Sequence, residues 1–515
     1  MKNNVYKLFI TGFVLFFASC ESYLDVNTSP NNPQYEDLSP DLTLSAAQTQ
    51  TYRLISGDTQ NFETSIRNSS LNQLGNLMMN SWAGNVNNTT QPYDDEYRSR
   101  LTASFYDNIW DWGYRNIANF QRIIDYKSDN YDNHKAIAKI LKSFYMQSIV
   151  DLYGDCPYSK AFLGTGNLYP AYDDDQAIYR GLLSELDAAI VLIDNANAAD
   201  AVVGSEDAML LGAMTTWKAF ANTIKLRLLI RESSSTNPAS VAFVATQLAS
   251  LSTATFLTTN VTINPGYNTT TVDRQNPFYA AYGYTITGAE STNRSLVTAS
   301  KFVADALNGT ADPRRGRLFT LVAGNVAGIQ QGALSGTPTA PSAPSFLGPA
   351  IIPVPTGTAP NLNATAGSTM SGYVMTLSEV EFLLAEAALL DPAYGSAQAH
   401  FNAGITASFT RLGAAGAAAY IAAVDGTSGF GWTGTVNKIE AIMTQKWIAL
   451  MSVNAHESWI DYVRTGFPVV PMALTNTVGK PKRLMYPTSE YVGNTDNVPN
   501  QTAATPFVSG PFWKN

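Results

Sequence analysis

The chain has 515 residues, of which 45% are hydrophobic and only 14% are charged. A hydrophobic fraction of this size supports a large folded core and excludes global disorder. The formal net charge is −9 and no run of Lys or Arg occurs, so a nucleic-acid partner is not expected. Three His and two Cys leave little for metal or thiol chemistry. This composition favours a secreted binding protein over an enzyme, and we expect no cofactor and no metal.

The first nineteen residues have the layout of a secretory signal peptide. Two lysines precede an eleven-residue apolar stretch, LFITGFVLFFA, which is too short to span a bilayer, and Ser19 then precedes Cys20. The sequence FASC resembles a bacterial lipobox, in which the cysteine is acylated and becomes the mature N-terminus. We therefore predict a signal peptide over residues 1–19, lipidation at Cys20, a tether over residues 20–40 and a single large domain over residues 41–515. The alternative is an ordinary signal peptide with a chance cysteine.

Beyond the tether, the spacing of apolar residues predicts a mainly α-helical protein. Between residues 133 and 154 they recur at the i, i+3, i+4, i+7 spacing of a helix with one buried face, and Gly154 ends the pattern. Repeated helix–turn–helix pieces of roughly 20–40 residues indicate tetratricopeptide-like helical pairs. Two segments, 252–293 and 336–360, lack the helical pattern, and we expect long irregular loops there. Further helices are predicted over 98–127, 173–194, 206–231, 295–307, 376–390 and 437–453.

Residues that could carry catalysis or bind a metal do not form a recognisable site. The three histidines stand alone, without the paired spacing of a zinc site. The sequence GFGWTG at 429–434 follows an Ala-rich helix instead of a strand, which argues against a dinucleotide loop. Asp173 to Asp175 fit the N-terminus of a helix better than a calcium site, because acids there favour the helix dipole. Carboxylates are plentiful, so a glycosidase remains an open alternative.

The positive signal is aromatic. Residues 82–114 hold eight Trp, Tyr and Phe in 33 positions, and a flat ring packs well against the C–H face of a sugar. We expect the aromatics from Tyr106 to Tyr114 to be core residues, since they fall in a predicted helix. Trp82 lies in a polar loop, and we expect an exposed stacking platform. The full set of candidate ligand-binding residues is Trp82, Asn85, Asn87, Tyr93, Tyr97, Tyr279, Tyr282 and Tyr284. The alternative is that these aromatics pack the loops onto the helices.

Five motifs, in order along the chain, resemble those of SusD/RagB-type lipoproteins. They are YGDCPYSKAF (153–162), ADPRR (311–315), TLSEVEFLLAEAALL (376–390), QKWIALMSVNAHESWIDYVRTGFP (445–468) and RLMYPTSEYVGN (483–494). The chain departs from the family pattern at Gln445 and Lys446, where many members carry Glu-Arg.

The resemblance implies a SusD-like fold with tetratricopeptide-like helical pairs and long ligand-binding loops. It also implies a nutrient-binding lipoprotein on the outer membrane of Bacteroidetes-type bacteria, held by its lipid anchor only and facing the cell surface. Such proteins sit as a lid on a SusC-like, TonB-dependent transporter and deliver glycans, or sometimes peptides, without cleaving them. In glycan-binding relatives a loop Trp followed by Asn contacts the ligand, and Trp82 with Asn87 resembles this pair. The alternatives are a peptide-binding member of the same fold and a glycoside hydrolase, which the resemblance argues against.

Overall fold

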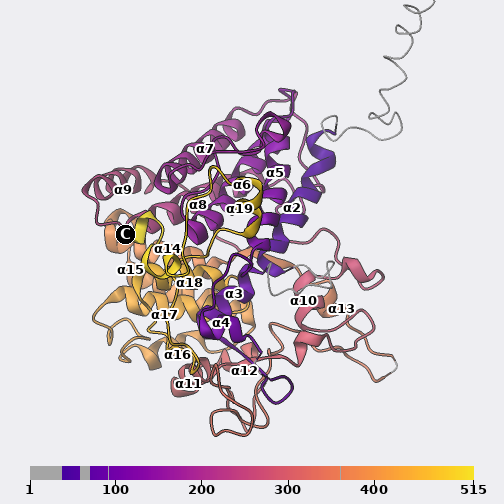
Figure 1. Cartoon of the computed structure of the whole chain (residues 1–515), viewed down its shortest axis with the longest axis vertical. Coiled ribbons are helices and arrows are strands. Elements are labelled where there is room, and N and C mark those ends of the chain that lie inside the picture. The colour runs from indigo at the N-terminus through magenta and orange to yellow at the C-terminus, as the bar shows by residue number, and fades with distance from the viewer. Residues whose placement is uncertain (1–37, 58–69, 91, 360, 515) are drawn as a thin grey trace, which may run out of the picture.

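Helices supply most of the regular structure in the computed structural model of this chain (Figure 1). The structure describes residues 38–57, 70–90, 92–359 and 361–514. The predicted signal peptide, Cys20 and nearly all of the predicted tether therefore lie outside the described residues. Within the described ranges, no helix is both long enough and apolar enough to cross a membrane.

The helices and strands have the following bounds. The longer helices are α2 (Pro40–Ser56), α3 (Leu71–Met78), α5 (Asn108–Ile124), α6 (Asp132–Tyr153), α7 (Asp175–Asn195), α8 (Met214–Glu232), α9 (Pro238–Leu251), α11 (Lys301–Gly309), α14 (Leu377–Leu390), α15 (Ala397–Leu412), α16 (Ala417–Val424), α17 (Lys438–Leu450) and α18 (Ala455–Thr465). The short helices are α4 (Asp94–Arg98), α10 (Pro277–Tyr282), α12 (Arg315–Leu318), α13 (Thr365–Ser368), α19 (Thr488–Gly493) and α20 (Thr505–Val508). The strands are β1 (Trp82–Gly84), β2 (Val261–Ile263), β3 (Val297–Ala299) and β4 (Gly372–Met375).

Several helix ends follow capping residues that are visible in the sequence. Thr376 caps α14 and Asn437 caps α17, each by accepting a hydrogen bond from a backbone N–H of the first turn. Gly154 lies at the C-terminal end of α6, as expected. The bounds of the predicted helices over 133–154, 376–390 and 437–453 are therefore confirmed to within a few residues, but α6 is buried on nearly all sides and not on one face only, because it packs on α5, α7 and α8.

Three predicted helices begin later than expected, 98–127, 206–231 and 295–307. The predicted helix over 98–127 is interrupted between α4 and α5, where Tyr106 has a φ of 55°, in the left-handed region that breaks a helix. The predicted helix over 206–231 begins only at α8. Before α8 the Asp207 carboxylate accepts hydrogen bonds from nearby backbone N–H groups and from the Trp217 indole, and it stabilises a turn in place of a helix.

Consecutive helices pack against each other in pairs, as expected for a tetratricopeptide-like scaffold. Helix α6 packs on α5 and α7, α7 packs on α8, and α8 packs on α9. A second group forms where α14 packs on α15 and α17, and α17 packs on α18. In Figure 1 the purple helices α5 to α9 form the upper part of the molecule and the orange helices α14 to α17 lie below them. Contacts between α8 and α14 join the two groups.

Only two small antiparallel sheets form in the described chain. Strand β1 pairs with β3, with Trp82 opposite Ala299, and β2 pairs with β4. Strand β3 occupies the start of the predicted helix 295–307, and Ser300 then caps α11. The predicted loop 336–360 forms no helix in its described part, which carries only turns and isolated bridges. Proline-rich sequence cannot donate the hydrogen bonds that a helix needs, which explains this segment.

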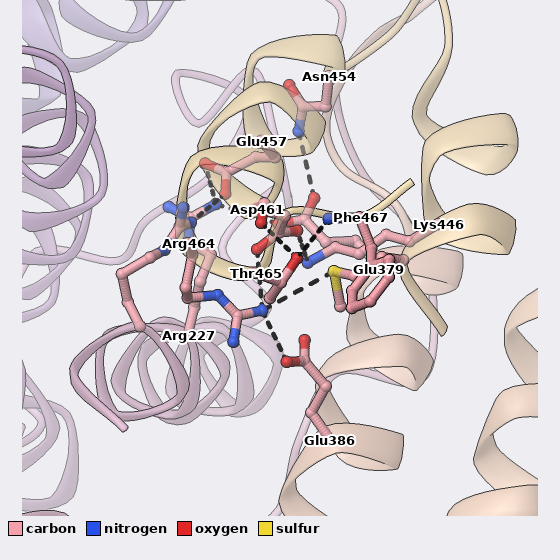
Figure 2. Close-up of polar contacts among 12 residues, drawn as sticks. Arg227, Glu379, Glu386, Lys446, Asn454, Glu457, Asp461, Arg464, Thr465 and Phe467 are labelled. Carbon is pink, nitrogen blue, oxygen red and sulfur yellow. Dashed lines mark hydrogen bonds and ion pairs between the residues drawn. The ribbon is translucent and has the colours of Figure 1, made fainter. Parts of the chain in front are cut away.

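A buried network of ion pairs connects α8, α14, α17 and α18 (Figure 2). Arg227 Nη1 lies 3.2 Å from Glu379 Oε1 and 3.2 Å from Glu457 Oε1, and all three side chains are at most 1% exposed. Lys446 Nζ lies 2.7 Å from Asp461 Oδ2. Burial alone would raise the pKa of Glu457, but the neighbouring guanidinium groups hold this pKa well below its usual range. Charges of two family-like motifs, 376–390 and 445–468, are therefore paired inside the scaffold, either within one motif or with Arg227 of α8.

Both positions at which the sequence departs from the family pattern belong to this buried interior. Gln445 Oε1 accepts a hydrogen bond from Arg314 Nη2 (2.8 Å), and its Nε2 donates to the Phe430 carbonyl (3.1 Å). Lys446 is 1% exposed and pairs with Asp461. An amide at position 445 can both accept and donate, which a carboxylate cannot do. The amide of Gln445 therefore matches the donor and the acceptor that the surrounding residues present at this position.

Candidate functional site

The structure buries the tryptophan that the sequence placed in an exposed loop. Trp82 is 0% exposed, and its ring centroid lies 5.2 Å from that of Tyr282 and 6.5 Å from that of Phe278. Its Nε1 donates a hydrogen bond to Ser452 Oγ (3.1 Å). The prediction of an exposed stacking platform at Trp82 is therefore wrong. The cause is the pairing of β1 with β3, a partner more than two hundred residues away that the loop composition does not reveal.

The other predicted tyrosines also lie in the interior and hold loops onto the helices. Tyr97 Oη accepts from Gly84 N (2.7 Å), Tyr279 Oη donates to the Pro353 carbonyl (3.0 Å), and Tyr282 Oη donates to Gln73 Oε1 (2.7 Å). All the predicted tyrosines are at most 8% exposed, namely Tyr93, Tyr97, Tyr279, Tyr282 and Tyr284. The exposed surface that ligand contact requires is therefore missing from these side chains. The alternative, that the aromatics pack the loops, is what the geometry favours.

The two predicted asparagines differ from each other. Asn85 is 3% exposed and its Nδ2 donates to the Ser295 carbonyl (3.0 Å), so it secures the β1 loop. Asn87 is exposed, and its amide contacts the Pro341 carbonyl (2.9 Å) and the Ser335 hydroxyl (3.1 Å). Of the eight predicted residues, Asn87 alone has an exposed side chain in this structure.

An open cleft lies elsewhere, along the outer face of α5. We call it the α5 cleft. Its volume is about 700 Å³, within the range of small-molecule sites. It is lined by Asn108, Trp110, Asp111, Trp112, Tyr114, Arg115, Pro157, Ala161, Phe162, Gly164, Asn167, Leu168, Pro170, Ser489 and Glu490. Two of the five family-like motifs, 153–162 and 483–494, therefore contribute walls to this cleft.

The spacing of residues on α5 explains why this face is open. Asn108, Asp111, Trp112 and Arg115 follow the i, i+3, i+4, i+7 pattern of one helix face, which carries mostly polar groups and lies outward. On the inner side, Gly113 faces α6 so closely that an added Cβ would lie 2.9 Å from Ile149 Cδ1. A glycine here lets α5 seat against α6 and turns the Trp112 side outward.

Aromatic rings form the floor and one wall of the α5 cleft. Trp110 is 2% exposed and stacks near Tyr172, with ring centroids 6.2 Å apart. Tyr114 stacks against Phe162 at 5.7 Å, and its hydroxyl donates to the Pro157 carbonyl (2.7 Å). These rings are fixed by their neighbours, so a ligand would not have to order them.

Trp112 differs from the other rings of the cleft. Its side chain is only partly buried, and its indole N–H makes no hydrogen bond within the described residues. The expectation that the aromatics from Tyr106 to Tyr114 are core residues therefore holds for Tyr106 and Trp110, which are 1% and 2% exposed. It holds only in part for Trp112 and Tyr114, which pack against the core but are partly exposed, because each also lines the α5 cleft.

The helix α19 closes the cleft with polar groups. Glu490 accepts hydrogen bonds from Trp110 Nε1 (3.2 Å) and from Tyr172 Oη (2.8 Å), and Ser489 Oγ donates to Asp111 Oδ1 (2.6 Å). Burial and the Glu490 charge raise the pKa of Tyr172, so its phenol stays protonated and keeps donating. Arg115 is exposed and forms no ion pair within the described residues. The rim therefore offers a free cation and amide groups beside flat rings.

Carboxylates close enough to share a metal ion occur once in the described chain, at Asp155, Asp174 and Asp175. Asp174 Oδ1 accepts from Ala177 N (2.9 Å) as the cap of α7, and Asp155 Oδ1 accepts from Asp175 N (3.0 Å). The prediction that Asp173 to Asp175 begin a helix is confirmed. The loop GFGWTG follows α16, a helix, as predicted.

A catalytic pair of carboxylates would need to face a substrate. Glu379 and Glu457 lie close together, but both contact the Arg227 guanidinium and are at most 1% exposed. A water molecule or sugar cannot reach them, and general acid catalysis requires such contact.

Comparisons with known proteins identify relatives over nearly the whole chain. A family described as SusD-like, "Starch-binding associating with outer membrane", matches residues 44–487. Among solved structures, a chitin-binding SusD homolog from Flavobacterium johnsoniae has a TM-score of 0.71 at 23% identity and covers 92% of this chain and 98% of its own. A SusD homolog from Bacteroides vulgatus has a TM-score of 0.70 at 20% identity and covers 91% of this chain and 97% of its own. A SusD-like protein from Bacteroides thetaiotaomicron has a TM-score of 0.66 at 21% identity, covering 91% and 98%. No curated protein sequence matches.

Proposed function

The chain belongs to the SusD-like family, a family of binding proteins without catalytic activity, and from this we propose that it is a surface lipoprotein that captures glycans in the α5 cleft. It then hands them to a SusC-like, TonB-dependent transporter in the outer membrane. The observation that supports this proposal most directly is the partly exposed Trp112 ring, which lies in a preformed aromatic cleft of about 700 Å³.

The chemistry of the α5 cleft suits a neutral, hydroxyl-rich ligand. Sugar rings present C–H faces that pack on a tryptophan ring, and their hydroxyl groups need donors and acceptors around that ring. The rim supplies both, through Arg115, Asn108 and Asn167. The matching family is described as starch-binding, and two of the similar structures are chitin-binding proteins, which supports a glycan as the ligand class.

The proposed outer-membrane location and the proposed transporter partner are supported by different observations. The family description associates its members with the outer membrane, and the FASC sequence before residue 21 fits a lipid anchor at Cys20. The SusC-like partner follows from the resemblance of the five motifs. Crosslinking in cells followed by gentle extraction should recover a large outer-membrane protein with the tagged chain, and its consistent absence would favour a free-standing binder.

An array of neutral oligosaccharides and peptides tests the ligand class, using the full chain purified in detergent. We expect binding of an oligosaccharide and a loss of at least ~30-fold in affinity for Trp112→Ala, because truncating a central aromatic anchor typically costs about 2 kcal/mol or more. Trp432→Ala is the matched control, since Trp432 is a partly buried tryptophan outside the cleft. Unchanged affinity in a folded Trp112→Ala variant would contradict the proposed site. Peptide binding alone would favour the peptide-binding alternative.

A further inference from the structure

A second hollow lies between α2, α10, β4 and the C-terminal end of α15. We call it the Arg411 cavity. Its volume is about 410 Å³, and it shares no lining residue with the α5 cleft. Residues that define it include Tyr52, Phe278, Met370, Tyr373, Arg411 and Ser452. Several of these side chains, Arg411 among them, are partly exposed, so the cavity is open to solvent.

Arg411 is the charged residue of this cavity, and it lacks a carboxylate partner. Its Nη2 donates to the Ala449 carbonyl (3.0 Å), and its guanidinium lies over the Tyr373 ring, with Cζ 5.6 Å from the ring centroid. Its Nε is cut off from solvent and has no acceptor. Among the described residues, no Asp or Glu lies within ion-pair distance of Arg411.

Most buried guanidinium groups of this chain have an anionic partner; Arg294 and Arg483 also lack one among the described residues, but neither of them lines the Arg411 cavity or the α5 cleft. Arg227, Arg231, Arg314 and Arg464 each lie within 3.2 Å of a carboxylate oxygen. This is the ordinary arrangement, because a guanidinium removed from water needs a compensating anion. Burial lowers the pKa of Arg411 to about 10, which reflects the same cost, yet the group remains charged at neutral pH. The Arg411 cavity therefore holds an uncompensated positive charge.

The other residues that line the Arg411 cavity indicate which kind of anion would fit. Ile55, Phe278, Ile351 and Met370 give an apolar surface, whereas hydroxyl groups come from Ser371 and Ser452 in the lining set. A small inorganic anion would leave most of this surface uncovered. We propose that the Arg411 cavity binds a carboxylate ligand with an apolar body, and that the guanidinium of Arg411 holds the carboxylate. Guanidinium and carboxylate match in geometry and charge, which favours this pairing over a neutral ligand.

This binding site goes beyond the glycan site of the α5 cleft, and either site can fail without the other. Two sources supply a carboxylate on an apolar surface: the C-terminus of a short apolar peptide, and an acidic sugar, whose only apolar surface is the C–H face of its ring. The probes are N-acetyl-leucyl-phenylalanine with its amide, and digalacturonic acid with its dimethyl ester. Each pair differs in the charge of its carboxyl groups and is otherwise nearly unchanged in shape.

Calorimetric titration of the full chain in detergent provides the test. We expect one acid to bind at least about tenfold more tightly than its neutral counterpart, and Arg411→Gln to remove this preference. Arg411→Lys should keep part of it, because the charge stays while the planar donor geometry is lost. Arg274→Gln, at an exposed arginine outside both hollows, is the matched control and should bind like the wild type. Preference for the peptide acid assigns a peptide terminus, and preference for digalacturonic acid assigns an acidic sugar.

If the Arg411→Gln variant does not fold, a second variant, Met370→Trp, still tests the proposal. Met370→Trp fills the cavity without touching the charge, and it should abolish binding of the acid while the melting temperature stays near that of the wild type. Trp112→Ala should leave the preference for the acid unchanged, which separates this proposal from the glycan site. The proposal is overturned if neither acid binds, if acid and neutral probes bind equally, or if the preference survives in a folded Arg411→Gln variant.

Discussion

Arg464 Nη2 donates to the Glu386 carboxylate at 2.6 Å, and both side chains are at most 3% exposed. This contact joins α18 to α14 across 78 residues of the chain, and Asp461 gives the same guanidinium a second acceptor at 3.1 Å. Two of the five family-like motifs, 376–390 and 445–468, therefore contact each other through these side chains. Their role is to fix α14 and α18 relative to each other.

The first prediction concerns this pair. Arg464→Leu leaves the Glu386 charge buried without its cation, and we expect the free energy of unfolding to fall by about 3–5 kcal/mol. Urea denaturation measures the change. Lys301→Leu removes an exposed i,i+4 pair with Asp305 and should cost less than about 1 kcal/mol. Equal effects of the two substitutions would show that the Arg464 pair is not buried in solution.

The second prediction concerns Trp82. Because its ring is fully buried and its Nε1 is hydrogen-bonded, Trp82→Ala should lower the free energy of unfolding by about 3–5 kcal/mol. Val436→Ala, at a side chain that is 99% exposed, should leave unfolding nearly unchanged. Loss of glycan binding with wild-type unfolding would instead restore Trp82 as a surface platform.

The third prediction is a pH dependence. Burial, with smaller contributions from the Asp155 and Asp174 charges, raises the pKa of Asp175 to about 6. In the unfolded chain this pKa is about 4. The native state therefore binds more protons between these values, and this group lowers the free energy of unfolding as the pH rises from about 4 to 6. Above about pH 6 the Asp175 carboxyl is mainly ionised in both the folded and the unfolded chain, and its contribution to the free energy of unfolding is lost.

Asp175→Asn removes that titration, and its readout is the slope of unfolding free energy against pH. We expect the decline between about pH 4 and 6 to become shallower in the variant. Absolute stability is a poorer readout, because Asp175 also accepts hydrogen bonds from Phe512 N and Gln176 N. An unchanged slope would mean that the carboxyl titrates as it does in water.

The fourth prediction concerns anchoring. Cys20→Ala should abolish acylation, since the predicted lipid is attached through that sulfur. Detergent phase partitioning should then move the protein from the detergent phase to the aqueous phase. Mass spectrometry of the N-terminal peptide provides an independent reading. A wild-type peptide without acyl mass and unchanged partitioning would refute the lipid anchor.

Sequence patterns predicted the scaffold well because its determinants are local. The apolar stripe of α6, the caps Thr376 and Asn437, and the glycine after α6 all act within one or two helical turns. The prediction failed at Tyr106 and Asp207, where a left-handed residue and a multiply bonded carboxylate replace a helical turn.

The site was harder to predict because contacts across the chain decide exposure. A polar loop around Trp82 indicated solvent contact, but β3 supplies a strand partner and Ser452 an acceptor. A helical position for Trp112 indicated a core residue, and the side chain does pack against the core, but it also lines the α5 cleft and stays partly exposed there. Arg411 gave no sequence signal, since the absence of a carboxylate partner is visible only when all neighbouring elements are in place.

The bond from Trp110 to Glu490 has a consequence for how the protein matures. These two residues are 380 positions apart, and Ser489 and Asp111 are joined over a similar distance. Closing contacts of such long range is slow compared with forming local helices, so the cleft is completed after the helix pairs have formed. Its rim depends on residues near the end of the chain. A translocated chain cut before residue 488 would therefore lack α19, and with it the Ser489 and Glu490 groups that close the cleft.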